Sequence, residues 1–245
     1  MLESWRQGTG SHPGNIALKI ISWNLLRLIG AAVEDVAALI ESERPDLLLM
    51  QEATAEMAAL PELVGGDFLR VPLPRRIHGL AAWSAGPLPK IRVLPLPASR
   101  MPGRLPRRIA QCLNFAGVNF ANVHLSHGQL LNRWQLLHIA AKLKGPAAII
   151  GDYNAVGPTI LPGFRDVGPR EPTHMAQKVV PFRLDRCLVR GLDCSASRTL
   201  DRGRSDHRPI ALALAPSCAE DLALRDVPRL WRRFAAEEGG AAAGR

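Results

Sequence analysis

Polar side chains of the types used in catalysis follow the apolar runs of this sequence, and the letters GDYN at 151–154 are the clearest case. They come directly after the apolar run 147–150 and place the carboxylate of Asp152 two residues before the carboxamide of Asn154. In an extended chain these two side chains point the same way. Because Gly, Asp and Asn are also the commonest turn residues, the motif alone predicts either a plain turn or the edge of a site that binds a charged group.

Further polar residues lie at the ends of other short apolar runs: Asn24, Glu52, His124, Asp185, Asp206 and His207. A single polar residue in such a place usually caps a strand or starts a turn. In a layered sheet, however, strand ends on one side converge on one rim, and the loops of that rim commonly carry function. We therefore expect these side chains to meet Asp152 and Asn154 at one rim.

The chemistry of this set suits a hard cation and a phosphate. Oxygen ligands with no cysteine and few histidines favour Mg²⁺ or Mn²⁺ over Zn²⁺. Mg²⁺ keeps several waters and needs only one or two carboxylates besides a substrate phosphate. A neighbouring Asp can orient or deprotonate a water, and a His with a carboxylate partner can stabilise charge on a phosphoryl oxygen.

Length and composition predict a cytoplasmic protein with one large domain. The chain has 245 residues, which is enough for one sizeable core. No run approaches the roughly 18 apolar residues of a membrane span, and residues 1–15 lack the apolar core of a secretory signal. The four cysteines show no ligand-like spacing, so we expect free thiols in a reducing compartment.

The formal net charge of +9 is unevenly distributed along the chain. Between Phe68 and Gly151 there is no Asp or Glu, yet there are twelve Lys or Arg. Such a block can attract nucleic acid or an anionic membrane surface. Enrichment in Arg over the whole chain, 26 against 5 Lys, offers a plainer explanation of the cations, but it does not explain the missing acids.

Apolar periodicity predicts a sandwich of two sheets with helices outside. Strands are predicted at 16–23, 46–52, 78–85, 90–96, 107–115, 118–125, 147–151, 183–189 and 209–215, with a hairpin over 113–123 whose turn is Ala-Gly. A first helix has Val33, Val36, Ala37 and Ile40 at helical spacing and ends before Pro45, and a second has Leu130, Trp134, Leu137 and Ala141.

The predicted organisation has three parts: a flexible segment 1–15, one domain at 16–215, and a tail at 216–245. In the tail an apolar stripe lies among arginines and is followed by a stretch predicted to be disordered; the stripe is Val227, Leu230, Trp231 and Phe234. This pattern predicts a basic amphipathic helix that docks on its own domain, on a partner or on a membrane.

The order and spacing of five motifs resemble those of the endonuclease/exonuclease/phosphatase superfamily, which includes DNase I-like and exonuclease III-like enzymes. The motifs are SWN at 22–24, QE at 51–52, GDYNA at 151–155, RLD at 183–185 and SDHRP at 205–209. The resemblance extends over about residues 16–214. It implies a four-layer α/β sandwich, in which two mixed β-sheets pack face to face with helices outside, and Mg²⁺-dependent phosphoester hydrolysis.

Matched position by position, the resemblance implies roles at the metal and at the attacking water. Glu52 would be the metal ligand, Asn24 would help to hold the metal or the phosphate, and Asp206 would lie near the metal. Asp152 would position or activate the water. Asn154 would hydrogen-bond the same group or the phosphate.

The resemblance also implies contacts with the scissile phosphate. His207 would touch this phosphate, with Asp185 as its orienting partner, and His124 would be a phosphate contact or a proton donor. Further candidates for phosphate or substrate contact are His78, His127 and Arg107. On the predicted second helix, Arg133 and Gln135 are expected to be structural.

The sequence departs from the abasic-site endonucleases of this superfamily. Those enzymes bring a tyrosine from the middle of the chain to the phosphate, whereas the single tyrosine here is Tyr153, inside the GDYN motif. This departure argues against abasic-site specificity.

Nucleic acid is the first expectation for the substrate because of the block of Lys and Arg without acids, and a phospholipid head group or another small phosphoester is the alternative, favoured by the basic amphipathic tail and the missing mid-chain tyrosine. A non-catalytic basic binding module is disfavoured because every motif residue is present. No obligate protein partner is predicted.

Overall fold

The computed structural model describes residues 17–98, 107–176 and 179–217. Its helices and strands are β1 (Leu18–Asn24), α1 (Val33–Glu43), β2 (Leu47–Ala53), the 3₁₀ helix η1 (Ala55–Ala59), α2 (Leu60–Val64), β3 (Asp67–Pro72), β4 (Gly79–Ser84), β5 (Arg92–Pro95), β6 (Ile109–Phe115), β7 (Val118–His124), α3 (Gln129–Lys142), β8 (Ala147–Asp152), β9 (Arg165–Asp166), β10 (His174–Ala176), β11 (Val180–Phe182), β12 (Asp185–Arg190), β13 (Leu192–Thr199) and β14 (Ile210–Pro216). The predicted flexible segment 1–15 and the predicted amphipathic helix of the tail lie outside the described residues.

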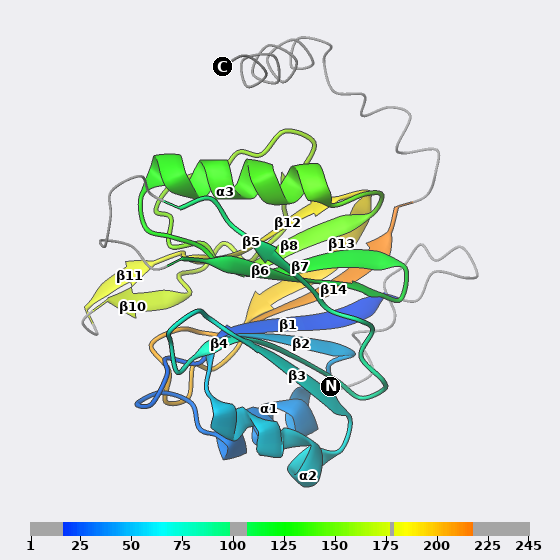
Figure 1. Cartoon of the computed structure of the whole chain (residues 1–245), viewed down its shortest axis with the longest axis vertical. Coiled ribbons are helices and arrows are strands. Elements are labelled where there is room, and N and C mark those ends of the chain that lie inside the picture. Colours follow the sequence, from blue (N-terminus) through cyan, green and yellow to red (C-terminus); the bar gives the residue numbers. More distant parts are fainter. Residues whose placement is uncertain (1–16, 99–106, 177–178, 218–245) are drawn as a thin grey trace.

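Two six-stranded mixed sheets form the centre of the molecule (Figure 1). The strand order is β13-β14-β1-β2-β4-β3 in the first sheet and β5-β6-β7-β8-β12-β9 in the second, and β10 and β11 form a separate hairpin. β1 runs parallel to β2, and β7 runs parallel to β8, whereas the other neighbours are antiparallel. Each parallel pair is connected through a helix, as a crossover between parallel strands requires.

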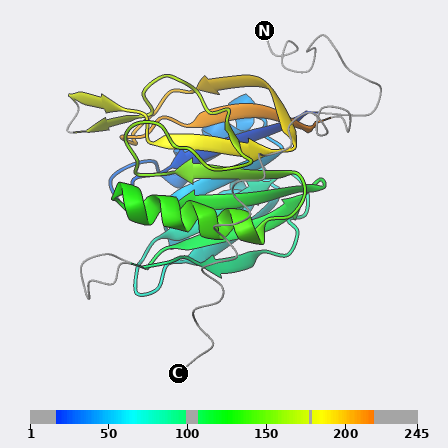
Figure 2. The same ribbon diagram turned by 90° about the horizontal axis from the view of Figure 1, so that it is seen from above.

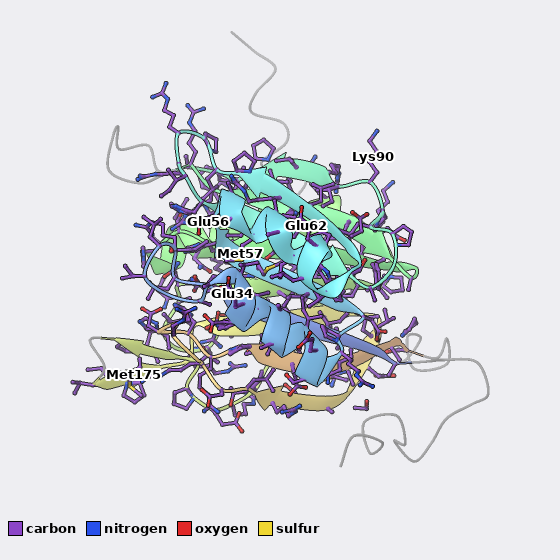
Figure 3. The ribbon with its side chains drawn as sticks, turned by 90° about the horizontal axis from the view of Figure 1, so that it is seen from below. Glu34, Glu56, Met57, Glu62, Lys90 and Met175 are labelled. Carbon is purple, nitrogen blue, oxygen red and sulfur yellow. The ribbon has the colours of Figure 1, made fainter. Side chains whose placement is uncertain are left out.

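The sheets pack face to face, and helices cover both outer faces (Figure 1). Ile20, Leu49, Phe120 and Ile150 belong to the core cluster between the sheets, because alternate side chains of each strand point inward. α1 and α2 lie side by side below the first sheet (Figure 3), and α3 lies across the second (Figure 2). The four-layer sandwich predicted from the sequence is thereby confirmed.

An amide network ties the two sheets together beneath the strand ends. Nε2 of Gln51 donates to Oγ of Ser22 (3.0 Å) and to Oδ1 of Asn122 (2.7 Å). Nδ2 of Asn122 in turn donates to Oε1 of Gln111 (2.9 Å). Because buried amides lose stability when a partner is missing, this network fixes how the two sheets are aligned.

Of the two long helices, α1 buries the face predicted from the sequence, whereas α3 does not. α1 buries Val36, Ala37 and Ile40, as its periodicity predicts. α3 exists, but the stripe that predicted it is exposed: Leu130, Trp134, Leu137 and Ala141. Its buried face is made of Asn132, Gln135, Leu136 and Ile139. The amphipathic face assigned to this helix from the sequence is therefore wrong, because two buried amides take the place of apolar residues.

Local predictions for turns and cysteines agree with the structure. Ala116 and Gly117 both have left-handed backbone (φ 48° and 80°) between β6 and β7, which fits the twist of a two-residue hairpin. Cys112, Cys187 and Cys194 are free thiols, and the fourth cysteine, Cys218, lies outside the described residues. Within the described ranges no helix is long and apolar enough to cross a membrane.

Candidate active site

The strand ends meet at one rim of the sandwich, where a pocket of about 490 Å³ opens. Nine residues predicted from the sequence line it: Asn24, Glu52, His78, His124, His127, Asp152, Asn154, Asp206 and His207. Asp185 lies directly behind His207 and bonds to it. Arg107 is exposed and does not line the pocket.

Strand topology explains this convergence. Asn24 faces Gln51 across the parallel pair β1–β2, and His124 faces Asp152 across the parallel pair β7–β8. Because neighbouring parallel strands end at the same edge, each sheet brings two such ends together. The sheets also meet there, since Nδ2 of Asn24 donates to Oδ2 of Asp152 (3.0 Å).

Glu52 reaches the pocket through an irregularity in its strand. The pairing of β2 with β4 shifts at this residue, and its φ of 57° lies in the left-handed region. Bulges of this kind redirect side chains, and strained backbone concentrates at functional sites. Oε1 of Glu52 lies 4.0 Å from Nδ1 of His124, and Oε2 lies 3.0 Å from Nη1 of Arg27.

The charges around Glu52 favour its ionised form. Burial alone would raise the pKa of Glu52, but the neighbouring His124, Arg27 and His78 outweigh burial and hold this pKa below its usual range. A carboxylate at neutral pH is the form that binds a cation.

Asp152 is buried at the end of β8 and held by a turn. Gly151 before it has a φ of 140°, and a Cβ atom there would lie 2.1 Å from a backbone oxygen of β7. Oδ1 of Asp152 accepts a hydrogen bond from the backbone N–H of Asn154 (2.8 Å), and Nδ2 of Asn154 donates to the carbonyl of Leu125 (3.0 Å). The GDYN motif therefore forms a turn that is also part of the site.

His207 and Asp185 form a buried pair. Nδ1 of His207 lies 2.8 Å from Oδ2 of Asp185, so that Nε2 faces the pocket, 3.9 Å from Oδ2 of Asp152. Ser205 supports the loop, because its Oγ accepts from the backbone N–H of His207 (3.1 Å) and donates to the carbonyl of Asn24 (2.7 Å). These bonds fix the orientation of the imidazole ring.

The two buried histidines have opposite pKa shifts. Burial alone would lower the pKa of His207, but the carboxylates of Asp185 and Asp152 outweigh burial and raise this pKa to about 10. Burial dominates at His124 and lowers its pKa to about 4. His207 is therefore an imidazolium at neutral pH, whereas His124 is uncharged. The nearby His207 and His124 also hold the pKa of Asp152 below its usual range, although burial alone would raise it.

Sequence reasoning missed His174, which belongs to the β10–β11 hairpin. Its ring lies against the ring of His207, with the centroids 4.4 Å apart, and its Nδ1 is 3.7 Å from Oδ2 of Asp206. The hairpin is attached at Thr173, whose Oγ1 accepts the backbone N–H of Asp185 (2.9 Å). The hairpin has no alternating apolar run, so no sequence signal marked it.

Three arginines line the pocket besides the predicted residues: Arg27, Arg76 and Arg108. Arg108 is only 7% exposed, and its Nε has no hydrogen-bond partner among the described residues. Burial lowers the pKa of Arg108, and the charges of Asp152 and Glu52 act against this shift. The sequence predicted Arg107 instead, and only the register of β6 distinguishes these two neighbours.

The single tyrosine of the chain lies away from the pocket. Tyr153 is fully buried, and its hydroxyl donates to the carbonyl of Ile149 (2.8 Å). Its side chain packs in the core beneath α3. No tyrosine is therefore available at the pocket, because the chain has no other.

The residues present fit a divalent cation. Two groups have ligand atoms within 4.8 Å of one another, namely His174, Asp206 and His207, and Asp152, Asp185 and His207. Because His207 is an imidazolium at neutral pH, the carboxylates and His174 are the ligands that these groups offer. Oδ1 of Asp206 and Oδ1 of Asp185 are buried without a hydrogen-bond partner in the described part of the chain. Glu52 belongs to neither group but lines the same pocket. The carboxylate oxygens are the donors that hard cations prefer.

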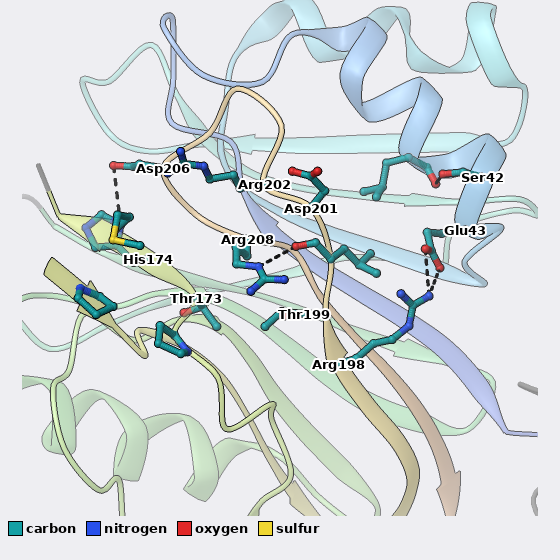
Figure 4. A pocket seen from close by; sticks show the side chains of 15 residues that line it. Ser42, Glu43, Thr173, His174, Arg198, Thr199, Asp201, Arg202, Asp206 and Arg208 are labelled. Atoms are coloured by element: carbon teal, nitrogen blue, oxygen red, sulfur yellow. Dashed lines mark hydrogen bonds and ion pairs between the residues drawn. The ribbon is translucent and has the colours of Figure 1, made fainter. Parts of the chain in front are cut away.

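A second pocket of about 750 Å³ adjoins the first and shares His174 and Asp206 with it (Figure 4). Its wall has both signs of charge. Arg198 is held by Glu43, with Nη2 and Oε2 2.7 Å apart, and Arg208 donates to a backbone carbonyl of the same wall. The adjoining space can therefore hold a polar group that is attached to a ligand in the first pocket.

Comparisons with known proteins agree with this geometry. The model of the Endonuclease/Exonuclease/phosphatase family matches residues 21–207, which include all the motifs quoted for the resemblance except the last two residues of SDHRP. The resemblance read from the sequence is thereby confirmed. No curated protein is significantly similar to this chain in sequence.

Solved structures with the same fold include proteins of different named activities. An endonuclease/exonuclease/phosphatase from Bacteroides vulgatus is 16% identical and has a TM-score of 0.69, covering 82% of this chain and 99% of its own. A mannosyl-6-phosphatase from Bacteroides thetaiotaomicron VPI-5482 is 17% identical, with a TM-score of 0.63 and coverage of 80% and 99%. A humanized D. rerio TDP2 is 17% identical, with a TM-score of 0.64 and coverage of 81% and 98%. At these identities the likeness concerns the fold alone.

Proposed function

Because the chain belongs to the endonuclease/exonuclease/phosphatase family, whose members hydrolyse phosphoester bonds, we propose that it is a Mg²⁺-dependent phosphodiester hydrolase. Mn²⁺ is the alternative metal. The observation that carries the proposal is the buried pair of His207 and Asp185, in which Nδ1 and Oδ2 lie 2.8 Å apart. The free Nε2 of His207 faces Asp152 in a pocket lined with carboxylates.

The metal would be held by Glu52, with Asp206 close to it and Asn24 on the same wall. Asn24 acts chiefly through its bond to Asp152, since its own Oδ1 accepts from the backbone N–H of Leu26 (3.2 Å). Bound Mg²⁺ would polarise a phosphoryl oxygen and lower the pKa of a bound water.

Asp152 would orient the attacking water. It is ionised at neutral pH because the nearby His207 and His124 lower its pKa, and a carboxylate of lowered pKa is a hydrogen-bond acceptor more than a strong base. Asn154 fixes it through the turn at 152–154. The water would thus be held in position for attack on the phosphorus.

His207 would stabilise the charge that develops on the phosphate. As an imidazolium it can donate from Nε2 to a phosphoryl oxygen, while Asp185 holds Nδ1 and keeps the ring in place. His124 is uncharged at neutral pH and lies between Glu52 and Asp152. It would accept or donate a single proton there.

Nucleic acid remains the first candidate substrate, and the arginines of the pocket support it. Arg27, Arg76 and Arg108 offer positive charge beside the proposed position of the phosphate, and phosphate contacts supply most of the affinity for a nucleic acid. A phospholipid head group or another small phosphoester is the second candidate, because the carboxylates and arginines that line the pocket suit a phosphate whatever group it is attached to. The buried hydroxyl of Tyr153 supports neither substrate against the other.

The test is Mg²⁺-dependent hydrolysis on a panel of plasmid DNA, single-stranded DNA, an abasic duplex, RNA, anionic phospholipid vesicles and the small diester bis(p-nitrophenyl) phosphate. The wild-type protein should hydrolyse at least one of them. The Asp152→Asn variant should lose roughly 10²-fold or more of that rate. Glu62→Gln, which removes an exposed carboxylate on α2, is the matched control. Near-normal turnover by Asp152→Asn would refute the assignment.

A further inference from the structure

Two arginines among the described residues are more than nine-tenths buried, and they are held in different ways. Arg186 is 3% exposed; its Nη1 lies 3.3 Å from Oδ2 of Asp166, and its Nη2 donates to the backbone carbonyl of Gly157 (2.6 Å). Arg108 is 7% exposed, but no hydrogen bond or ion pair between described residues involves its side chain, and its Nε is buried. Buried guanidinium groups are almost always paired, so the side chain of Arg108 needs an explanation.

The strand pairing places Arg108 at the active site. Arg108 directly precedes β6, and its carbonyl accepts from the backbone N–H of Leu96 (3.0 Å). In the antiparallel pair β6–β7, Ala110 lies opposite Val123, so that continuing this register sets Arg108 beside the end of β7, where His124 lies. Arg108 and His124 both line the 490 Å³ pocket.

The carboxylates closest in effect to Arg108 already have other partners. Burial lowers the pKa of Arg108, and the charges of Asp152 and Glu52 act against this shift, so the guanidinium lies within reach of both. Asp152, however, accepts from the backbone N–H of Asn154 (2.8 Å), and Glu52 accepts from Nη1 of Arg27 (3.0 Å). Arg108 therefore has no counter-ion of its own among the described residues.

The other two arginines of the pocket differ from Arg108 in their exposure. Arg27 is bound to Glu52, and 44% of its side chain is exposed. Arg76 is exposed as well. Charges in contact with water are screened by salt, whereas a buried charge keeps most of its strength. Arg108 is thus the arginine whose charge acts chiefly on a ligand inside the pocket.

A phosphate group has the charge and the shape that the side chain of Arg108 would bind. A guanidinium is protonated at all pH values near neutrality, and its planar set of N–H donors matches two oxygens of one phosphate. His207, an imidazolium at neutral pH, lines the same pocket. Two buried cationic donors can contact different oxygens of one phosphate and stabilise the charge that develops on them during hydrolysis.

We propose that Arg108 is a catalytic residue that binds the scissile phosphate, with its guanidinium donating to a non-bridging oxygen other than the one that His207 contacts. The role in catalysis rests on the function proposed above, whereas the phosphate contact can be measured without hydrolysis. Because the buried charge of Arg108 is unpaired in the free protein, it lowers stability, and bound phosphate offsets this loss.

The first measurement is thermal unfolding of the full chain with Mg²⁺ over a series of inorganic phosphate concentrations. A ligand that binds only the folded state raises the unfolding temperature as its concentration increases. Phosphate should do so for the wild-type protein, and Arg108→Met should need roughly tenfold more phosphate, or more still, for the same rise. Arg133→Met, the same change at an exposed arginine of α3 outside the pocket lining, is the matched control and should respond like wild type.

The same measurement without phosphate separates a ligand-binding arginine from a structural one. Arg108→Met should unfold at the wild-type temperature or above it, because it removes an unpaired buried cation and keeps an unbranched side chain. Arg186→Met should unfold at a lower temperature, because the carbonyls of Ala155 and Gly157 lose their donor. The two buried arginines should therefore shift the unfolding temperature in different directions.

Hydrolysis of bis(p-nitrophenyl) phosphate tests the catalytic role. Arg108→Met should lower kcat by roughly 10²-fold or more. Arg108→Ala leaves space beside the pocket, and guanidinium ion added below denaturing concentrations should restore part of its rate, whereas Arg133→Ala should not respond. Arg108→Lys should bind phosphate more weakly than wild type, because an ammonium lacks the planar set of donors, and it replaces Arg108→Met if that variant fails to fold.

The proposal and the proposed function can fail separately. An Arg108→Met protein that binds phosphate as tightly as wild type would overturn the proposal, and so would one that unfolds at a lower temperature without phosphate, as a structural arginine would cause. Hydrolysis that survives Arg108→Met would refute the role of Arg108 alone and leave the proposed function standing. Phosphate binding that depends on Arg108, in a protein that hydrolyses no member of the panel, would support the phosphate contact and refute only the proposed reaction.

Discussion

The two parallel strand–helix–strand units of this protein, β1–α1–β2 and β7–α3–β8, have the same topology but use their helices differently. α1 covers its sheet with Val36, Ala37 and Ile40. α3 covers the other sheet with Leu136 and Ile139 but also turns two amides inward. The first helix thus serves mainly for packing, and the second combines packing with support of the active site.

The amides of α3 hold the two loops that carry site residues. Nδ2 of Asn132 donates to the carbonyl of Tyr153. Oε1 of Gln135 accepts from the backbone N–H of Ser126, and its Nε2 donates to Oγ of the same residue (3.0 Å each). In the first unit the loop 25–32 intervenes between strand and helix and is closed by its own backbone bonds. A helix that starts beside the site can hold the site loops through buried amides. These amides then replace apolar side chains on its buried face.

The largest expected difference between the units lies in their strand-end carboxylates. Glu52→Gln should shift the Mg²⁺ concentration for half-maximal activity upward by roughly tenfold or more, because it removes the proposed metal ligand of the first unit. Asp152→Asn should instead lower the rate at saturating Mg²⁺ by about 10²- to 10³-fold, or about 2.7–4 kcal/mol.

Titration of bis(p-nitrophenyl) phosphate hydrolysis with Mg²⁺ measures both quantities for these two variants. Glu62→Gln controls for the loss of a carboxylate elsewhere. If both variants lowered only the rate at saturating Mg²⁺, or if both raised only the Mg²⁺ concentration for half-maximal activity, the two units would not differ in role.

The second difference concerns stability. Ile40→Ala in α1 should lower the free energy of unfolding by about 3 kcal/mol, because the side chain is buried and leaves a cavity. Leu137→Ala in α3 should change it by less than about 1 kcal/mol, since this leucine is 44% exposed. Urea unfolding followed by circular dichroism tests the pair, and equal losses would contradict the assignment of the buried faces.

This contrast also marks what the sequence can predict. Periodicity found both helices, but it could not tell which face of α3 is buried, because Leu130 and Trp134 have the same spacing as a true core stripe. Beside the site, α3 buries the amides of Asn132 and Gln135 where the apolar pattern would place apolar side chains. Hydrophobicity therefore predicts the layers, and it fails beside the site, where polar contacts decide.

The residues of the site likewise fall into those that the sequence predicts and those that it does not. Motif residues such as Asp152 and His207 were named from the sequence because short apolar runs mark the strand ends, and the structure brings them to one pocket. His174 and Arg108 were missed. The first lies on a hairpin without a local signal, and the second differs from Arg107 only through strand register, a long-range property.

A third effect should follow from the buried amide of α3. Gln135→Leu keeps the size of the side chain but leaves the backbone N–H of Ser126 without its acceptor, which should cost about 2 kcal/mol of unfolding free energy. Activity should fall as well, because this loop follows His124. Chemical denaturation together with kcat measures both. Arg133→Leu, at an exposed position on the same helix, is the matched control, and a Gln135→Leu variant as stable and active as this control would show that α3 does not support the site.

The smallest effect is a pH dependence of stability that arises in the first unit. Glu43 at the end of α1 lies 2.7 Å from both Lys19 and Arg198. Burial alone would raise the pKa of Glu43, but its bonds to these two cations outweigh burial and lower it from its usual 4.5. The folded pKa is therefore the lower one. The stabilisation is complete above the unfolded pKa and is lost as the pH falls through the folded pKa.

Glu43→Gln should consequently destabilise the protein at pH 7 by less than about 1 kcal/mol, because the pair is partly exposed. The difference from wild type should shrink toward zero as the pH falls below the usual range of a glutamate. Glu41→Gln, an exposed acid on the same helix, should show no such convergence. Thermal unfolding over a pH series measures this, and a difference that stayed constant with pH would mean that Glu43 contributes through packing and not through its charge.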